Sequence, residues 1–196
     1  MEMHEILWHG RGGQGVVLAA QILAEAAYIQ GFRGITSAPT FGPERRGAPL
    51  TASTRISDTP VRTFSQIVSA DIAVILDESL FETATSKGRI KENGLVIVNS
   101  TLGPDQIRRD GSFSIATVDA VNIAKEHHLS IKGSPVLNTP LLGAFSMASG
   151  LVSLENIESG LKKKMPQGRA FSNFQAIRTA FERTTVFKVN TSKAEV

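Results

Sequence analysis

The chain alternates short apolar runs with longer segments in which apolar residues recur every three or four positions. Continuous runs of aliphatic residues, such as 72–76 and 95–98, are typical of strands covered on both faces of a sheet. Residues 50–57 instead alternate between apolar and small polar side chains, as a half-buried strand does. The predicted strands are residues 6–8, 35–38, 50–57, 72–76, 95–98, 114–118 and 185–189.

The segments between these strands predict helices. Apolar residues almost encircle residues 16–29, which indicates a buried helix. Asp119 and Ser153 are placed to cap the starts of two helices, and Gly150 to end another. Asn93-Gly94 predicts a turn. The predicted helices are residues 16–29, 80–90, 120–128, 141–149, 154–164 and 173–183.

Strands that alternate with helices and lack a polar face indicate an α/β fold. We expect a three-layer α/β/α sandwich around a mostly parallel sheet, formed by one domain over residues 1–196 with a frayed tail at 191–196. Such sheets bind ligands at the carboxyl ends of their strands. Polar residues at predicted strand ends are His9, Asp77, Glu78, Asn99 and Ser100, and Asp77 is placed equally well to cap a helix.

A glycine-rich turn joins the first predicted strand to the first helix. Gly10, Gly12 and Gly15 fit the spacing G-x-G-x-x-G, so we expect a Rossmann-like first strand-to-helix turn. A phosphate would fit the exposed N–H groups at such a helix start. The carboxylate that binds ribose about 20 residues later in NAD sites is missing, and Arg33 stands in that region. The spacing alone therefore does not predict a dinucleotide site.

A second unusual segment holds Glu44, Arg45 and Arg46 between Gly42-Pro43 and Gly47-Ala48-Pro49. Prolines on both sides limit the backbone, and arginine side chains suit phosphates and carboxylates. This loop is either a clamp for an anion or partner, or an exposed charged loop.

Composition and charge exclude several classes. The 196 residues are 41% hydrophobic and 20% charged, which is typical of a globular protein, and the net charge is only +3. Without a basic stripe interleaved with aromatics, nucleic acid is not an expected partner. The absence of cysteine excludes disulfides and cysteine-ligated zinc or iron–sulfur clusters within this chain. Neither a secretory signal nor a membrane-spanning run is evident, so we expect a cytoplasmic protein.

Three ordered motifs together resemble the gamma subunit of 2-oxoacid:ferredoxin oxidoreductases. They are residues 9–17 (HGRGGQGVV), 41–49 (FGPERRGAP) and 138–145 (NTPLLGAF). The resemblance extends from about residue 5 to 189 and is strongest to the pyruvate and 2-oxoisovalerate enzymes. Phe41 departs from the tyrosine usual in the family.

The resemblance implies a subunit that is inactive alone. The complex would decarboxylate a 2-oxoacid with thiamine diphosphate and Mg, pass electrons through [4Fe-4S] clusters to ferredoxin, and form acyl-coenzyme A. Alpha, beta and delta subunits would be the partners, and other subunits would hold thiamine diphosphate and the clusters. Candidate binding residues are Gly10, Arg11, Gly12, Gly13, Gln14, Gly15, Glu44, Arg45, Arg46, Asn138 and Thr139.

Two roles for this chain remain open under that resemblance. Its glycine turn and charged loop either shape the entrance for coenzyme A or serve only subunit contacts. A different interpretation is a free-standing reductase that uses NAD(P) or flavin.

Overall fold

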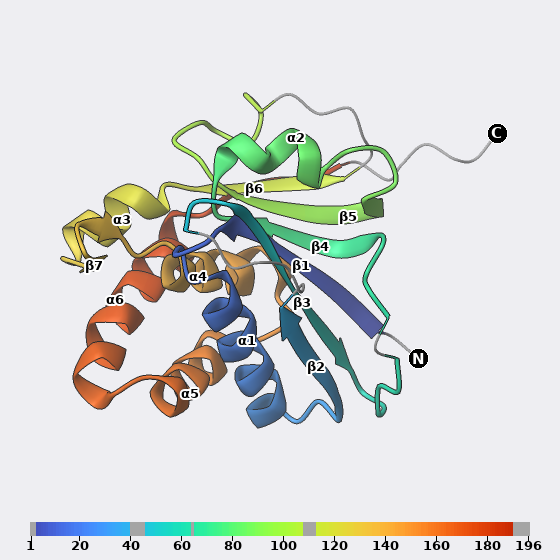
Figure 1. Ribbon diagram of the computed structural model, residues 1–196, viewed down its shortest axis with the longest axis horizontal. Coiled ribbons are helices and arrows are strands. Elements are labelled where there is room, and N and C mark those ends of the chain that lie inside the picture. Colours follow the sequence, from blue (N-terminus) through green and yellow to red (C-terminus); the bar gives the residue numbers. More distant parts are fainter. Residues whose placement is uncertain (1–2, 40–45, 64, 108–112, 190–196) are drawn as a thin grey trace.

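A computed structural model describes residues 3–39, 46–63, 65–107 and 113–189. Strands and helices alternate through most of the chain (Figure 1). The strands are β1 (Met3–Arg11), β2 (Gly34–Pro39), β3 (Pro49–Ser57), β4 (Ala70–Ile75), β5 (Ile90–Asn99), β6 (Ser114–Val118), β7 (Ser130–Ile131), β8 (Ser134–Pro135) and β9 (Thr185–Phe187). The helices are η1 (Glu78–Leu80), α1 (Val16–Gln30), α2 (Phe81–Ala84), α3 (Ala120–Glu126), α4 (Asn138–Ser149), α5 (Leu154–Lys164) and α6 (Gln167–Arg183).

The main sheet has seven strands in the order β2-β3-β1-β4-β5-β6-β9. The four strands β1, β4, β5 and β6 pair with one another in parallel. Strand β3 is antiparallel to both β1 and β2, and β9 is antiparallel to β6. The predicted α/β class with a mostly parallel sheet is therefore confirmed. Because β3 lies between β1 and β2, the second strand along the chain is not a neighbour of the first.

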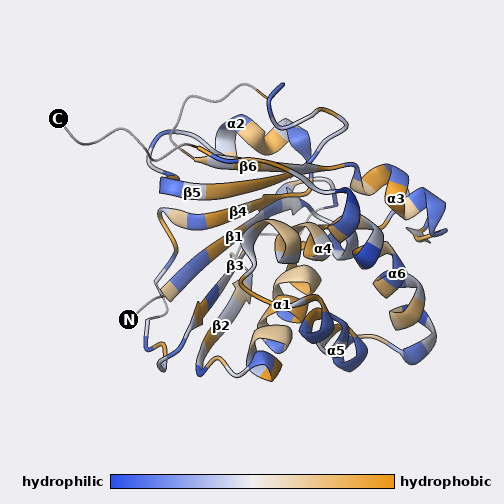
Figure 2. Cartoon of the chain, turned by 180° about the vertical axis from the view of Figure 1, so that it is seen from behind, coloured by the Kyte–Doolittle hydropathy of each residue, from blue (hydrophilic) through white to orange (hydrophobic). Residues whose placement is uncertain are grey.

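One side of the sheet, here called the helical face, is covered by two layers of helices. Helix α1 packs on β1, β2 and β3, and α4 packs on β5 and β6, while α5 and α6 pack on the outside of α1 and α4 (Figure 1). This double cover explains why apolar residues encircle α1. Trp8 of β1 stacks on Phe145 of α4 with ring centroids 6.1 Å apart, and both side chains are buried. Figure 2 shows hydrophobic residues concentrated in the central strands and inner helices, and many hydrophilic ones on α5.

The opposite side of the sheet is covered unevenly. Over β4, β5 and β6 a second apolar cluster joins Ala73, Ile75 and Val98 of the strands to Ala84 of α2. Among the described residues, α1 makes most of the helix contacts with β1, β2 and β3, and Phe145 of α4 also reaches Trp8 of β1, in both cases from the helical face. The sandwich is thus complete over one half of the sheet and has a single helical side over the other.

Most predicted elements are confirmed, with boundaries shifted by a few residues. Asp119 and Ser153 cap α3 and α5 through their side chains, and Gly150 ends α4 in the left-handed conformation. Helix α6 begins six residues before its predicted start at 173. The short β7–β8 hairpin was not predicted.

Two local predictions are wrong. The predicted helix at 80–90 is limited to η1 and the four residues of α2, because the chain turns at residues 85–89, with Gly88 in the left-handed conformation, before β5 begins at Ile90. The predicted turn at Asn93-Gly94 lies inside β5. There the register shifts between the pairs Ala70–Ile90 and Ile72–Leu95, so these residues form an irregularity in the strand rather than a hairpin.

A partly buried ionic cluster, centred on buried Arg55, joins the amino-terminal ends of β1 and β4. The guanidinium of Arg55, whose side chain is only 5% exposed, donates to Glu5 at 3.0 Å and to the carbonyl of Ser65 at 2.7 Å. Lys91 bridges the carboxylates of Glu5 and Asp71 at 3.3 and 2.9 Å. Partial burial opposes the charged form of Lys91, but the hydrogen bonds that its ammonium donates to Asp71 and Glu5, together with their negative charges, outweigh burial and raise the pKa of Lys91. The cluster secures the segment after β3 against the sheet.

Replacing Glu5 by Gln is expected to lower the free energy of unfolding by about 2 kcal/mol, because buried Arg55 would lose its ionic partner. Urea denaturation measures the change. Glu158→Gln removes the half-buried partner of exposed Lys162, four residues away on the same helix, and serves as the control, with an expected cost below about 0.5 kcal/mol. If the two substitutions lowered the free energy of unfolding equally, the ionic cluster around Arg55 would contribute no more than the ion pair on the helix surface.

Candidate functional site

The candidate site lies at the carboxyl ends of β1 and β4. After β1 the chain passes to α1 on the helical face, whereas after β4 it passes to η1 and α2 on the opposite side. Adjacent parallel strands whose connections leave on opposite sides create a crevice, and open α/β sheets bind ligands at such a crevice. The glycine turn therefore occupies the expected position for a ligand site.

The glycine turn packs directly against the third sequence motif. Gly15 has φ of +81°, and a Cβ atom there would lie 2.6 Å from Nδ2 of Asn138. At Gly10 a Cβ would lie 2.6 Å from a methyl group of Val16. Gly10 thus allows α1 to pack close to its strand, and Gly15 leaves room for the buried Asn138 at the start of α4.

The end of the charged loop is hydrogen-bonded to the same turn. The N–H of Gly12 donates to the carbonyl of Ala48 at 2.9 Å, and the N–H of Gly47 donates to the carbonyl of Gly12 at 3.0 Å. Arg46 is exposed, and its Cγ is 3.8 Å from where a Cβ on Gly13 would be. Glu44 and Arg45 lie outside the described residues. The structure therefore brings Arg46 and the predicted glycine residues together.

Arg11 links the carboxyl ends of β1 and β4 across the crevice. Its guanidinium donates to Asp77 at 2.9 Å, to Ser79 at 2.8 Å and to the carbonyl of Gly47 at 3.1 Å. Partial burial opposes ionisation of Asp77, but hydrogen bonds from Ser79 and Arg11 outweigh it and lower the pKa of the carboxyl group. Asp77 also caps η1 by accepting from the N–H of Ser79. Arg11 and Asp77 therefore hold the site together.

Gln14 reinforces this arrangement. Its side-chain oxygen accepts from the N–H of Arg11 at 2.7 Å, and the N–H of Gln14 donates to the carbonyl of Arg11. Together with the bond from Gly12, three backbone donors of the turn are thus already paired within the protein. This geometry differs from a turn whose N–H groups all face a pyrophosphate.

Two further candidates from the sequence make structural contacts. Thr139 donates to Asn173 of α6 at 2.6 Å, and both residues are buried. Asn99 donates to the carbonyl of Leu76 and accepts from the N–H of Ala120, so it joins the ends of β4 and β5 to the start of α3. Sequence reasoning missed the contact of Ser79 with Arg11, although an Asp-x-Ser pattern directly after a strand was a visible sign of a helix cap.

His9 projects from β1 on the side of the sheet opposite the helical face, next to the glycine turn. Burial lowers the pKa of His9 to about 4, and the positive charge of Arg89 acts in the same direction. Its Nε2 atom is buried and has no hydrogen-bond partner among the described residues. The imidazole is therefore neutral at pH 7, and one of its nitrogen atoms is left unsatisfied.

Comparison with known proteins identifies the family. The family model described as pyruvate ferredoxin/flavodoxin oxidoreductase matches residues 5–183. The chain belongs to this family. It is 44% identical over 190 residues to the "Pyruvate/ketoisovalerate oxidoreductases common subunit gamma" of Pyrococcus abyssi, with 95% of this chain and all of the relative covered.

Solved structures agree with this assignment to the pyruvate ferredoxin/flavodoxin oxidoreductase family. Pyruvate oxidoreductase subunit PORC from Thermotoga maritima has a TM-score of 0.80 and 34% identity, covering 96% of this chain and all of that chain. The 2-oxoglutarate:ferredoxin oxidoreductase of Magnetococcus marinus shares the fold, with a TM-score of 0.71 and 20% identity. The match covers 92% of this chain but only 30% of that longer one. The resemblance to gamma subunits is thus confirmed, and the free-standing reductase is not supported.

Acidification is expected to destabilise the folded chain through His9. Because its pKa is near the usual 6.5 when unfolded and about 4 when folded, the unfolded state binds more protons between these pH values. Stability should fall as pH decreases from 6.5 toward 4, by about 3 kcal/mol in total from this group. Urea denaturation across this range, compared with His9→Gln, measures the contribution. An unchanged pH dependence in the variant would show that His9 is not its source.

Proposed function

We propose that this chain is the gamma subunit of an oxidoreductase complex that oxidises pyruvate or a branched-chain 2-oxoacid, with coenzyme A as acyl acceptor and ferredoxin as electron acceptor. The observation that carries the proposal is the convergence of the three family motifs at one end of the sheet, through Gly15, Gly12 and Gly47. Alpha, beta and delta subunits are the proposed partners. The described helices include none long and apolar enough to cross a membrane.

The residues of this chain do not fit the redox cofactors of such a complex. Without cysteine, it offers no thiolate ligands for a [4Fe-4S] cluster. Within the described residues, no group of three or more His, Asp or Glu is placed to hold a metal ion. We therefore assign the clusters, and thiamine diphosphate with its Mg, to the other subunits.

The part proposed for this chain is the recognition of coenzyme A phosphates. Arg46 is exposed beside Gly13, and Glu44 and Arg45 immediately precede it in the chain. Arginine side chains next to a helix start provide the positive potential and the hydrogen-bond donors that phosphates require. Arg11 does not share this role, because its guanidinium already bonds Asp77, Ser79 and Gly47.

The name of the Pyrococcus relative supports a role of this subunit in binding coenzyme A rather than in choosing the 2-oxoacid. It describes one gamma subunit common to pyruvate and ketoisovalerate oxidoreductases. A subunit shared between two enzymes is suited to what their reactions have in common, such as the acyl acceptor, rather than to the 2-oxoacid side chain. We propose the same separation here, with the choice of 2-oxoacid made by other subunits.

A purely architectural role for the motifs is the competing proposal, and the contacts of Arg11 and Asn138 favour it for those two residues. It predicts that Arg45 and Arg46 contact only neighbouring subunits. The two proposals differ in the effect that loss of these arginines has on coenzyme A.

In the assembled complex, the double substitution Arg45→Ala, Arg46→Ala is expected to weaken coenzyme A binding by tenfold or more. Loss of one charge-assisted hydrogen bond accounts for about 1.5–3 kcal/mol, which corresponds to that range. Isothermal titration of the complex measures the affinity, and the KM for the 2-oxoacid should change less than about twofold. Arg178→Ala, which removes an exposed arginine of α6, is the matched control. Unchanged coenzyme A affinity in the double variant would favour the architectural role.

A further inference from the structure

The residue that follows Arg46 is held to the glycine turn by both of its backbone polar groups. The N–H of Gly47 donates to the carbonyl of Gly12 at 3.0 Å, and the carbonyl of Gly47 accepts from the guanidinium of Arg11 at 3.1 Å. Gly47 has φ of +81°, which glycine adopts without strain. These contacts fix the backbone at the point from which the exposed side chain of Arg46 extends.

The ladder between β1 and β3 ends just before this point. Arg11 and Pro49 are the last pair in its register, so residues 46–48 lie beyond it. Besides the two bonds of Gly47, the carbonyl of Ala48 accepts from the N–H of Gly12. Of these three bonds, the one from Arg11 is made by a side chain, so its geometry depends on what holds the guanidinium.

Arg11 is held by partners at the end of the neighbouring strand. Each of its three guanidinium nitrogen atoms makes one hydrogen bond, Nε to Asp77 at 2.9 Å, Nη2 to Ser79 at 2.8 Å and Nη1 to Gly47. A long arginine side chain has many rotamers, and the bonds to Asp77 and Ser79 select the one whose remaining nitrogen atom reaches Gly47.

Asp77 divides its two carboxylate oxygen atoms between these partners. Its Oδ1 atom accepts from the N–H of Ser79 at 3.1 Å, which caps η1. Its Oδ2 atom accepts from Arg11 and, at 3.4 Å, from the side-chain amide of Gln14. The carboxylate therefore joins the start of η1 to the arginine side chain, and both of its oxygen atoms take part.

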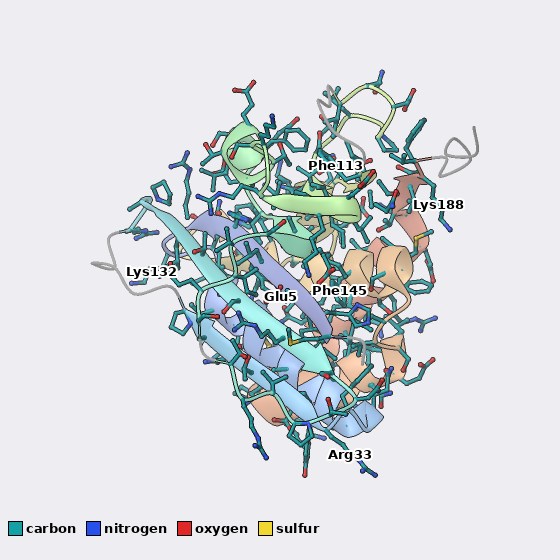
Figure 3. The ribbon with its side chains drawn as sticks, turned by 90° about the vertical axis from the view of Figure 1, so that its right-hand side faces the viewer. Glu5, Arg33, Phe113, Lys132, Phe145 and Lys188 are labelled. Atoms are coloured by element: carbon teal, nitrogen blue, oxygen red, sulfur yellow. The ribbon has the colours of Figure 1, made fainter. Side chains whose placement is uncertain are left out.

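The strand end that carries Asp77 is itself fixed on two sides. The N–H of Leu76, which is fully buried, donates to the carbonyl of His9 at 2.8 Å, and its carbonyl accepts from the side chain of Asn99 at 3.1 Å. These contacts lie at the opposite end of β1 from the ionic cluster, whose Glu5 is labelled near the centre of Figure 3. Asp77 is thus a fixed anchor that is separate from that cluster.

We propose that Asp77 is a positioning residue for coenzyme A, which acts through Arg11 and Gly47 to place the guanidinium of Arg46 where it binds a phosphate group. The inference rests on the proposed recognition of coenzyme A by Arg46. Binding costs less when the backbone of a binding residue is already ordered, so this placement raises affinity without any contact between Asp77 and the ligand.

Two conservative substitutions break this chain of contacts at different points. Asparagine has a single side-chain oxygen atom, so Asp77→Asn cannot accept from Ser79 and Arg11 as the two carboxylate oxygens do. Arg11→Lys keeps the positive charge, but its single nitrogen atom cannot replace the planar guanidinium that joins three partners. Asp119→Asn is the matched control, because Asp119 also follows a strand and caps a helix, where it bonds Asn122.

Hydrogen exchange tests the placement without coenzyme A. In the assembled complex, Asp77→Asn and Arg11→Lys are expected to speed deuterium uptake at the amide of Gly47 by about tenfold or more, because its hydrogen bonds open more often. Mass spectrometry of peptides that contain Gly47 measures the rate. Asp119→Asn should change it less than about twofold.

A double-mutant cycle tests whether Asp77 acts through Arg46. By isothermal titration of the complex, Asp77→Asn should raise the Kd for coenzyme A about fivefold or more. In a chain that already carries Arg46→Ala, it should raise the Kd less than about twofold, because the residue that it positions is absent. The kcat at saturating coenzyme A should stay within about twofold. Arg11→Lys provides the same cycle if Asp77→Asn does not assemble.

Equal losses of affinity in the two backgrounds would overturn the positioning role, and so would unchanged exchange at Gly47 in both variants. Either result leaves the proposed function intact as long as Arg46→Ala itself weakens coenzyme A binding. An unchanged Kd in Arg46→Ala would instead contradict the proposed recognition of phosphates, and the role of Asp77 would be overturned with it.

Discussion

The close contact between Gly15 and Asn138 is the constraint on which the candidate site depends. It joins the start of α1 to the start of α4, and these two helices form the inner layer over the sheet. Any side chain at position 15 would collide with the buried amide and would also require an unfavourable backbone conformation. With this contact in place, the glycine turn meets Ala48 and Gly47 on its other side, and residues from three separate motifs form one surface.

The same packing explains why this turn differs from a dinucleotide site despite its spacing. Hydrogen bonds to Ala48, to Arg11 and to the side chain of Gln14 already use three of its N–H groups, and Asn138 lies against Gly15. In addition, β3 lies between β1 and β2, so the second strand does not run beside the first as in a Rossmann fold. Tight turns of this type thus serve helix packing as readily as phosphate binding, and Arg46 beside the turn is the group left available to an anion.

The sheet is covered on both sides over β4, β5 and β6, and by helices on one side over β1, β3 and β2. Strands β3 and β2 form the antiparallel part of the sheet, and antiparallel strands commonly keep one face toward water. The short polar side chains of Thr36, Thr51 and Ser53 on that side agree with this rule. His9 lies on the same side of β1 but is mostly buried, so its unsatisfied Nε2 atom belongs to the interior and not to an exposed surface.

The sequence by itself determined the strands of the main sheet, most helices and several of their caps, because period, β-branching and capping residues act over a few neighbouring positions. It also identified the family, since three motifs in order are specific even when each is weak. The short α2 and the irregularity at Asn93-Gly94 were not predicted, because the pairing of β5 with β4 overrides local preference there. Only the tertiary structure decided that Arg11 is held by Asp77 and Ser79 and that the imidazole of His9 is buried with one nitrogen atom unsatisfied. Those properties depend on contacts between strands far apart in the chain, which no local pattern of residues records.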